Sequence, residues 1–143
     1  MAKSGKDFVI HSKGQIFLSS RILLVEDHDI SRQLLSDYLS FLGYQVLAIA
    51  DGAAFFSALS TFQPNLILLD LKIPFIDGYS ILQEIQAFPS DRQIPIIVIS
   101  AYAFKSDQQR ALNLGAKKYF VKPINLSLLR EAIQEILGGL TEQ

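Results

Sequence analysis

The sequence predicts an α/β fold in which five buried strands alternate with five helices. Apolar runs of three or four residues recur along the chain, and each is too short to form a helix by itself. The segments between them carry apolar residues at the spacing of an amphipathic helix. Half of the 143 residues are hydrophobic and only 19% are charged, so the chain can bury a sizeable core.

The predicted strands are continuous apolar runs rather than alternating ones. Continuous runs are typical of strands that are buried on both faces of a parallel sheet. In chain order they lie at residues 22–25, 46–49, 66–69, 96–99 and 119–121.

The first two strands are each followed by a helix with its own start or stop signal. Gly43 stops the first helix, Asp51 is the predicted N-cap of the second, and Pro64 lies just beyond its end. The apolar faces of these helices are Leu35, Leu39 and Leu42, then Phe55, Leu59 and Phe62.

The last three helices follow the same pattern. Pro89 closes the third, Gly115 occupies the position just past the end of the fourth, and we expect Gly138 and Gly139 to end the fifth early. Their apolar faces are Ile81, Ile85 and Phe88, then Ala111 and Leu114, then Leu129, Ile133, Ile136 and Leu140.

Repeated strand–helix units build a parallel sheet, because right-handed crossovers place helices on both of its faces. We therefore predict a three-layer α/β/α domain with the flavodoxin-like strand order 2-1-3-4-5. We assign this domain to residues 21–138, with residues 139–143 as a tail. Residues 1–20 are an extension or linker, either partly ordered or a small hairpin built from residues 8–10 and 16–18.

Composition excludes several classes of function. Lys plus Arg number 13 and Asp plus Glu number 14, so a net charge of −1 predicts no direct binding to nucleic acid or to membrane. The chain has no Cys and two His, which excludes thiolate zinc sites and disfavours a multi-histidine metal site. No apolar run approaches the ~18 residues of a membrane span, and no signal peptide is recognisable, so we expect a cytoplasmic location.

Function in doubly wound folds lies at the carboxyl ends of the strands. The first strand ends in Glu26 and Asp27, and the third ends in Asp70. These strands are neighbours in the predicted order, so three carboxylates converge and would repel one another without a cation. Oxygen ligands of this kind suit Mg²⁺.

The fourth and fifth strands add complementary groups at the same edge. Ser100 ends the fourth strand, and Lys122 with Pro123 ends the fifth. A carboxylate, a Mg²⁺ site, an ammonium and a hydroxyl together predict a phosphoryl-transfer site.

With these motifs the chain resembles the receiver domain of two-component response regulators. The resemblance covers about residues 21–138, and its motifs occur in order and at the right spacing. They are residues 22–27, residues 69–74 with Asp77 and Gly78, residues 95–101, residues 115–119 and residues 121–123.

The resemblance implies that Asp70 is the phosphoacceptor and receives its phosphoryl group from a histidine kinase or a histidine phosphotransfer protein. Glu26, Asp27, Asp70 and the backbone carbonyl of Lys72 would hold Mg²⁺. Such a domain is not an enzyme in the ordinary sense, because it catalyses only its own aspartyl phosphorylation and dephosphorylation.

The resemblance also assigns the other residues of the site. Ser100 and Lys122 would contact the phosphoryl oxygens, and the bond between Lys122 and Pro123 would be cis. Ser100 and Tyr119 would form a switch that alters the face made by the fourth helix, fifth strand and fifth helix. A downstream protein or a second copy of the chain would bind that face.

Other interpretations fit less well. A flavodoxin would need a phosphate cradle after the first strand, where this chain has acids, and the glycine motif of a dinucleotide site is missing. A receiver-fold interaction module that acts without phosphorylation remains the alternative. The sequence leaves open whether the domain stands alone or belongs to a longer chain such as a hybrid kinase.

Overall fold

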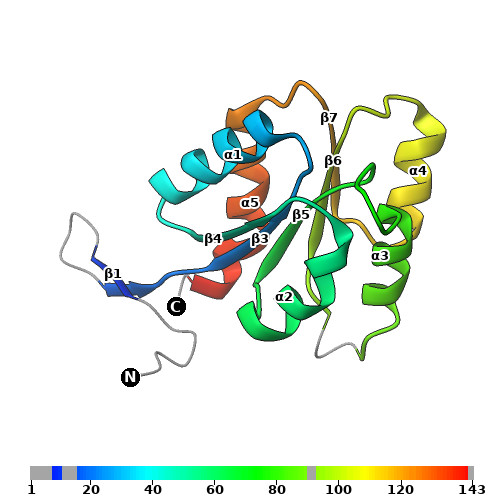
Figure 1. Cartoon of the computed structure of the whole chain (residues 1–143). Coiled ribbons are helices and arrows are strands. Elements are labelled where there is room, and N and C mark those ends of the chain that lie inside the picture. Colours follow the sequence, from blue (N-terminus) through cyan, green and yellow to red (C-terminus); the bar gives the residue numbers. More distant parts are fainter. Residues whose placement is uncertain (1–7, 11–15, 90–92, 142–143) are drawn as a thin grey trace.

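The computed structural model describes residues 8–10, 16–89 and 93–141. A parallel sheet of five strands lies at its centre, in the order β4-β3-β5-β6-β7. Figure 1 shows helices on both faces of this sheet. The three-layer α/β/α architecture and the predicted strand order are therefore confirmed.

The elements follow the predicted alternation closely. The strands are β3 (Arg21–Val25), β4 (Gln45–Ile49), β5 (Leu66–Asp70), β6 (Ile96–Ser100) and β7 (Lys118–Val121). The helices are α1 (Asp29–Phe41), α2 (Phe55–Phe62), α3 (Gly78–Gln86), α4 (Lys105–Asn113) and α5 (Leu126–Thr141), and a 3-10 turn, η1 (Gly52–Ala54), leads into α2.

Two apolar layers enclose the sheet, because successive side chains of a strand point to opposite faces. Leu23 of β3 belongs to the layer under α2, α3 and α4, whereas Leu24 belongs to the layer under α1 and α5. Both side chains are completely buried. Continuous apolar strands are thus the consequence of a sheet that is covered on both sides.

The helix ends also follow the predicted signals. Gly43 (φ +103°) and Gly115 (φ +106°) have the left-handed backbone that ends a helix, which glycine adopts without steric cost. The Asp51 carboxylate accepts a hydrogen bond from the Ala53 amide at 2.8 Å, so it caps η1 rather than α2 directly.

The prediction for the end of the fifth helix is wrong. Helix α5 continues through Gly138 and Gly139 to Thr141. Glycine costs about 1 kcal/mol relative to alanine inside a helix, which is too little to end one whose apolar face packs on the sheet. Leu129, Ile133 and Leu137 supply that packing.

At the amino end, β1 (Phe8–Ile10) pairs antiparallel with β2 (Ile16–Leu18), as the hairpin alternative predicted. The residues between these two strands lie outside the described part of the chain. Among the described residues, no helix has the length and apolar character needed to cross a membrane.

Candidate functional site

Strand register brings the predicted site residues to one edge of the sheet. Val25 pairs with Leu69, so Glu26 and Asp70, each one residue further on, lie side by side. Ser100 pairs with Val121 on the other side of β5, and its carbonyl accepts a 2.8 Å hydrogen bond from the Lys122 amide. Parallel pairing alone therefore assembles the site from β3, β5, β6 and β7.

Three carboxylates form the acidic part of the site. Oxygen atoms of Glu26, Asp27 and Asp70 lie within 4.8 Å of one another. The Glu26 and Asp70 side chains are buried, whereas Asp27 is exposed at the mouth. Burial of two like charges is unfavourable unless a cation compensates them.

Lys122 supplies one such cation. Its Nζ lies 2.7 Å from Glu26 Oε1 and 2.8 Å from Asp70 Oδ2. Burial alone would lower the pKa of the Lys122 ammonium, but the close contacts and negative charges of Glu26 and Asp70 outweigh this effect, and the pKa is raised. The peptide bond between Lys122 and Pro123 is cis.

Glu26 remains incompletely compensated. Its Oε2 accepts a 3.1 Å hydrogen bond from the His28 amide, while its buried Oε1 has the nearby ammonium but no well-directed hydrogen bond. Burial raises the pKa of the Glu26 carboxyl above its usual value, although Lys122 and the His28 amide act in the opposite direction. One ammonium therefore faces an excess of carboxylates.

The donor set fits a hard divalent cation. The three carboxylates that converge here offer only oxygen ligands, which Mg²⁺ prefers, and Glu26 Oε1 has unused acceptor capacity. Asp70 is oriented within the set, because its Oδ1 accepts a 3.0 Å hydrogen bond from the Lys72 amide and its Oδ2 faces Lys122. The Lys72 amide thus contacts the site through Asp70.

Ser100 and Tyr119 lie on the opposite side of Asp70 from Glu26. The Ser100 side chain is buried, and its Oγ accepts a 3.1 Å hydrogen bond from the Tyr102 amide. The half-buried Tyr119 ring packs against the core, and its hydroxyl donates to the Tyr102 carbonyl at 2.8 Å. Burial is the main cause of its raised pKa.

Two neighbouring contacts were not predicted from the sequence. Arg32 on α1 donates to the main-chain carbonyls of Glu26 and Asp27. Tyr79 at the start of α3 lies beneath the Arg110 guanidinium of α4, 3.8 Å from the ring centre. The only sequence signal for Arg32 is a cation in the first turn of a helix, where acids are favoured.

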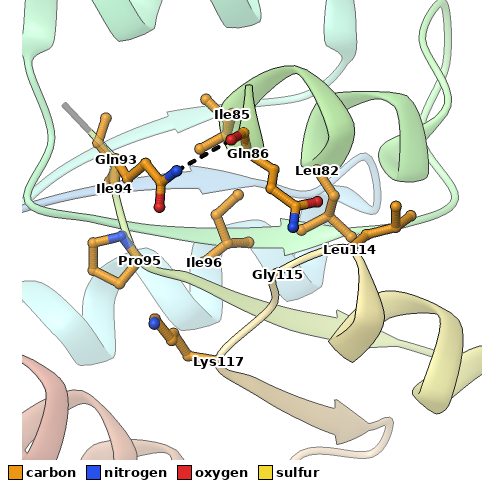
Figure 2. Close-up of a pocket in the computed structure, with 10 residues that line it drawn as sticks. All are labelled: Leu82, Ile85, Gln86, Gln93, Ile94, Pro95, Ile96, Leu114, Gly115 and Lys117. Carbon is orange, nitrogen blue, oxygen red and sulfur yellow. Dashed lines mark hydrogen bonds between the residues drawn. The ribbon is translucent and has the colours of Figure 1, made fainter. Parts of the chain in front are cut away.

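The opposite end of the sheet contains a different kind of hollow. A cavity of about 270 Å³ lies between the end of α3 and the loop that precedes β7. Figure 2 shows the residues that line it. Its polar lining consists of Gln86, Gln93 and Lys117, with no carboxylate side chain among the residues that line it. The predicted site residues are therefore concentrated at one edge of the sheet.

Comparison with known proteins supports this arrangement. Residues 22–134 match the model of the response regulator receiver domain. The chain is 37% identical over 117 residues to a probable transcriptional regulator, ycf27, of Porphyridium aerugineum, covering 82% of this chain and 48% of that protein. It thus spans about half the length of that relative.

One further protein and one solved domain are matched over nearly their whole length. The polar-differentiation response regulator DivK of Brucella ovis is 27% identical, with coverage of 85% of this chain and 98% of DivK. A receiver domain of a sensor histidine kinase from Pseudomonas aeruginosa, solved with a magnesium ion coordinated in its active-site cleft, is 33% identical with a TM-score of 0.75. That comparison covers 84% of this chain and 98% of the solved domain.

Proposed function

The chain belongs to the response regulator receiver domain family, and from that premise we propose that it is a phosphoacceptor of a two-component or phosphorelay system. Receiver domains are signalling modules rather than enzymes in the ordinary sense. The observation that carries the proposal is the convergence of Glu26, Asp27 and Asp70 on one point beside Lys122. Asp70 is the residue that accepts the phosphoryl group.

The transfer step follows from the position of Asp70. A carboxylate oxygen of Asp70 attacks phosphorus, the bond between phosphorus and the donor imidazole nitrogen breaks, and the leaving imidazole nitrogen regains a proton. Lys122 offsets negative charge on the phosphoryl oxygens, and the Ser100 hydroxyl would donate a further hydrogen bond to them. Lys122 and Ser100 therefore stabilise the acyl phosphate, and Asp70 is the one nucleophile that the step requires.

Mg²⁺ is the cofactor that this site would hold. Glu26, Asp27 and Asp70 would bind it with the backbone carbonyl of Lys72. When bound, the ion neutralises charge on the carboxylates and on the phosphoryl oxygens. The protein's part is to hold three acids close together at the end of buried strands.

Helix α1 offers a surface for the phosphodonor. Ile30, Leu34 and Phe41 are 75%, 57% and 85% exposed, and their spacing of four and seven residues places them along one face of the helix. This face begins beside Asp27 at the mouth of the site. A histidine kinase or histidine phosphotransfer protein that covers it could bring its phosphohistidine to Asp70.

The output surface is the face formed by α4, β7 and α5. Tyr119 of β7 reaches from the site towards this face through its bond to the Tyr102 carbonyl. A groove of about 670 Å³ lies between β7 and α5, lined in part by Phe120, Leu128 and Ala132. Phosphorylation would shift the conformational equilibrium of Ser100 and Tyr119. Through these residues it would alter the binding of a downstream protein or a second copy of the chain.

We extend the proposal to the rest of the chain. Residues 21–138 form the receiver, residues 1–20 an extension or linker, and residues 139–143 a tail whose first residues continue α5. The ycf27 regulator of Porphyridium aerugineum is about twice as long as the stretch that this chain matches. In a protein of that kind, the part attached to the receiver would determine the activity of the whole protein. We place the domain in the cytoplasm, where histidine kinases deliver phosphoryl groups, with no direct contact to nucleic acid or membrane.

The test is labelling with a small phosphodonor. With Mg²⁺ and acetyl phosphate, intact-mass measurement should show the gain of one phosphoryl group, which both EDTA and Asp70→Asn abolish. Asp51→Asn, which keeps a capping side chain outside the site, should label normally. Undiminished labelling of Asp70→Asn would refute the assignment, and absence of labelling in the wild type would favour the interaction module instead.

A further inference from the structure

We propose that Arg32 is a positioning residue for the metal site. Its guanidinium holds the main chain of Glu26 and Asp27, so that their carboxylates are arranged for Mg²⁺ before the ion arrives. The inference rests on the proposed function, because it takes these acids as the metal ligands. It assigns a role to a residue outside the cluster of acids, lysine and serine.

The contacts of Arg32 define this role. Its Nη1 donates to the Glu26 carbonyl at 3.0 Å and to the Asp27 carbonyl at 3.3 Å. Its Nη2 donates to Asp29 Oδ1 at 2.7 Å. The guanidinium thus joins the first turn of α1 to the segment that carries both acids, and a rigid planar fork can make all three contacts at once.

Asp27 depends on this contact more than Glu26 does. Glu26 is also fixed by its amide, which donates to the Ile49 carbonyl at 3.0 Å, and by its side-chain contacts with His28 and Lys122. Within the part of the chain that the structure describes, Arg32 is the hydrogen-bond partner found for Asp27. Loss of the guanidinium therefore frees Asp27 first.

The place of Arg32 in the helix is unfavourable in other respects. A cation in the first helical turn opposes the helix dipole. Its ion pair with Asp29 joins side chains that are 23% and 87% exposed, and exposed pairs contribute little to stability. The carbonyl contacts are thus the interactions that account for an arginine here, and residues that break a local rule concentrate at functional sites.

An electrostatic role and a positioning role predict opposite changes in Mg²⁺ affinity when Arg32 is removed. A guanidinium close to the acids repels a divalent cation, so an electrostatic role alone predicts that Arg32→Met binds Mg²⁺ more tightly. A positioning role predicts weaker binding, because Asp27 must then be ordered when the metal binds. Partners that orient metal ligands typically change metal affinity by about 10–100-fold when they are removed.

The experiment measures Mg²⁺ binding to the full chain by calorimetry and by the shift of the melting temperature. We expect Arg32→Met to bind Mg²⁺ about 10-fold more weakly than the wild type. Arg32→Lys, which keeps the charge but loses the fork, should also bind more weakly. Asp29→Asn is the matched control, since it breaks the ion pair without removing a donor to the two carbonyls, and its affinity should stay within about 2-fold of the wild type.

The rise in melting temperature caused by Mg²⁺ distinguishes a positioning role of Arg32 from general stabilisation of the fold. A residue that only stabilises the fold lowers the melting temperature of the metal-free protein and leaves the Mg²⁺-induced rise intact. A positioning residue reduces that rise. Arg32→Lys provides the same readout if Arg32→Met does not fold.

Failure of the inference can be told apart from failure of the proposed function. If the wild type binds Mg²⁺ and Asp27→Ala does not, the site is where we place it, whatever Arg32 does. Unchanged or tighter Mg²⁺ binding by both Arg32 variants would then overturn the positioning role alone. No Mg²⁺ binding by the wild type would overturn both.

Discussion

The two ends of the central sheet use polar residues in different ways. At the end where the strands begin, the side chains of Arg21 and Gln93 bond to main-chain carbonyls. Arg21 Nε donates to the Phe62 and Gln63 carbonyls at 3.0 and 2.9 Å. Gln93 Nε2 donates to the Gln86 carbonyl at 3.1 Å, the bond drawn in Figure 2.

At the end where the strands finish, polar side chains face one another. Glu26 and Asp70 share one ammonium, and Asp27 adds a third carboxylate at 4.8 Å or less. Arg21 and Gln93 at the first end satisfy backbone carbonyls and so stabilise the fold. Groups at the second end remain in excess over their partners and are fully compensated only when a cation binds.

The largest expected effect on stability comes from removal of the shared ammonium. Lys122→Met leaves Glu26 and Asp70 buried without a cation, and we expect a loss of about 3 kcal/mol in the free energy of unfolding. Lys118→Met is the control, because the Lys118–Glu135 pair is exposed and its atoms are 3.4 Å apart. That change should cost less than about 1 kcal/mol in urea unfolding. Equal losses would remove the contrast between a buried and an exposed lysine.

Removal of an acid should instead increase the stability of the metal-free protein. Asp27→Ala relieves repulsion among the carboxylates, and we expect the melting temperature without Mg²⁺ to rise by about 1–3 °C. The same variant should lose most of the stabilisation that Mg²⁺ gives the wild type. Thermal unfolding with and without Mg²⁺ measures both effects, with Asp37→Ala on the exposed face of α1 as control. A Mg²⁺ response equal to that of the wild type would contradict the ligand role of Asp27.

The lifetime of the phosphoryl group tests the mouth of the site. Tyr102 stands two residues beyond Ser100, and its side chain is 36% exposed. We expect its ring to restrict the access of water, so Tyr102→Ala should lose its phosphoryl group about 2–10-fold faster, a difference of roughly 0.4–1.4 kcal/mol in barrier. Phosphate release after removal of the donor measures this rate. An unchanged or slower release would show that the ring does not shield the site.

The smallest expected effect concerns the connection between the site and the output face. Ser100→Ala removes the hydroxyl that would bond to the phosphoryl group but keeps the carboxylates. Labelling of Asp70 should therefore persist. In NMR spectra of the wild type, beryllofluoride should shift the signals of Tyr119 and of residues 103–114, and these shifts should be lost in Ser100→Ala. Equal shifts in both proteins would place the connection elsewhere.

Much of this contrast between the two ends could be predicted from the sequence. Runs such as residues 66–69 identify strands buried on both faces, and parallel strands necessarily bring Asp70 and Glu26 to the same edge. Arg32 could not be predicted in this way, because its acceptors are main-chain carbonyls that every residue carries. The end of α5 was missed because the packing of Leu137 outweighs the intrinsic preference of Gly138.

The central claim is that the carboxyl edge of the sheet carries a phosphoacceptor at Asp70. The most direct measurement is to phosphorylate the protein with acetyl phosphate and Mg²⁺, reduce the acyl phosphate with borohydride and map the modified peptide by mass spectrometry. Reduction converts a phosphorylated aspartate into homoserine, so the account predicts homoserine at position 70 and unmodified Glu26 and Asp27. Homoserine at another aspartate, or none in a protein that binds Mg²⁺, would contradict it.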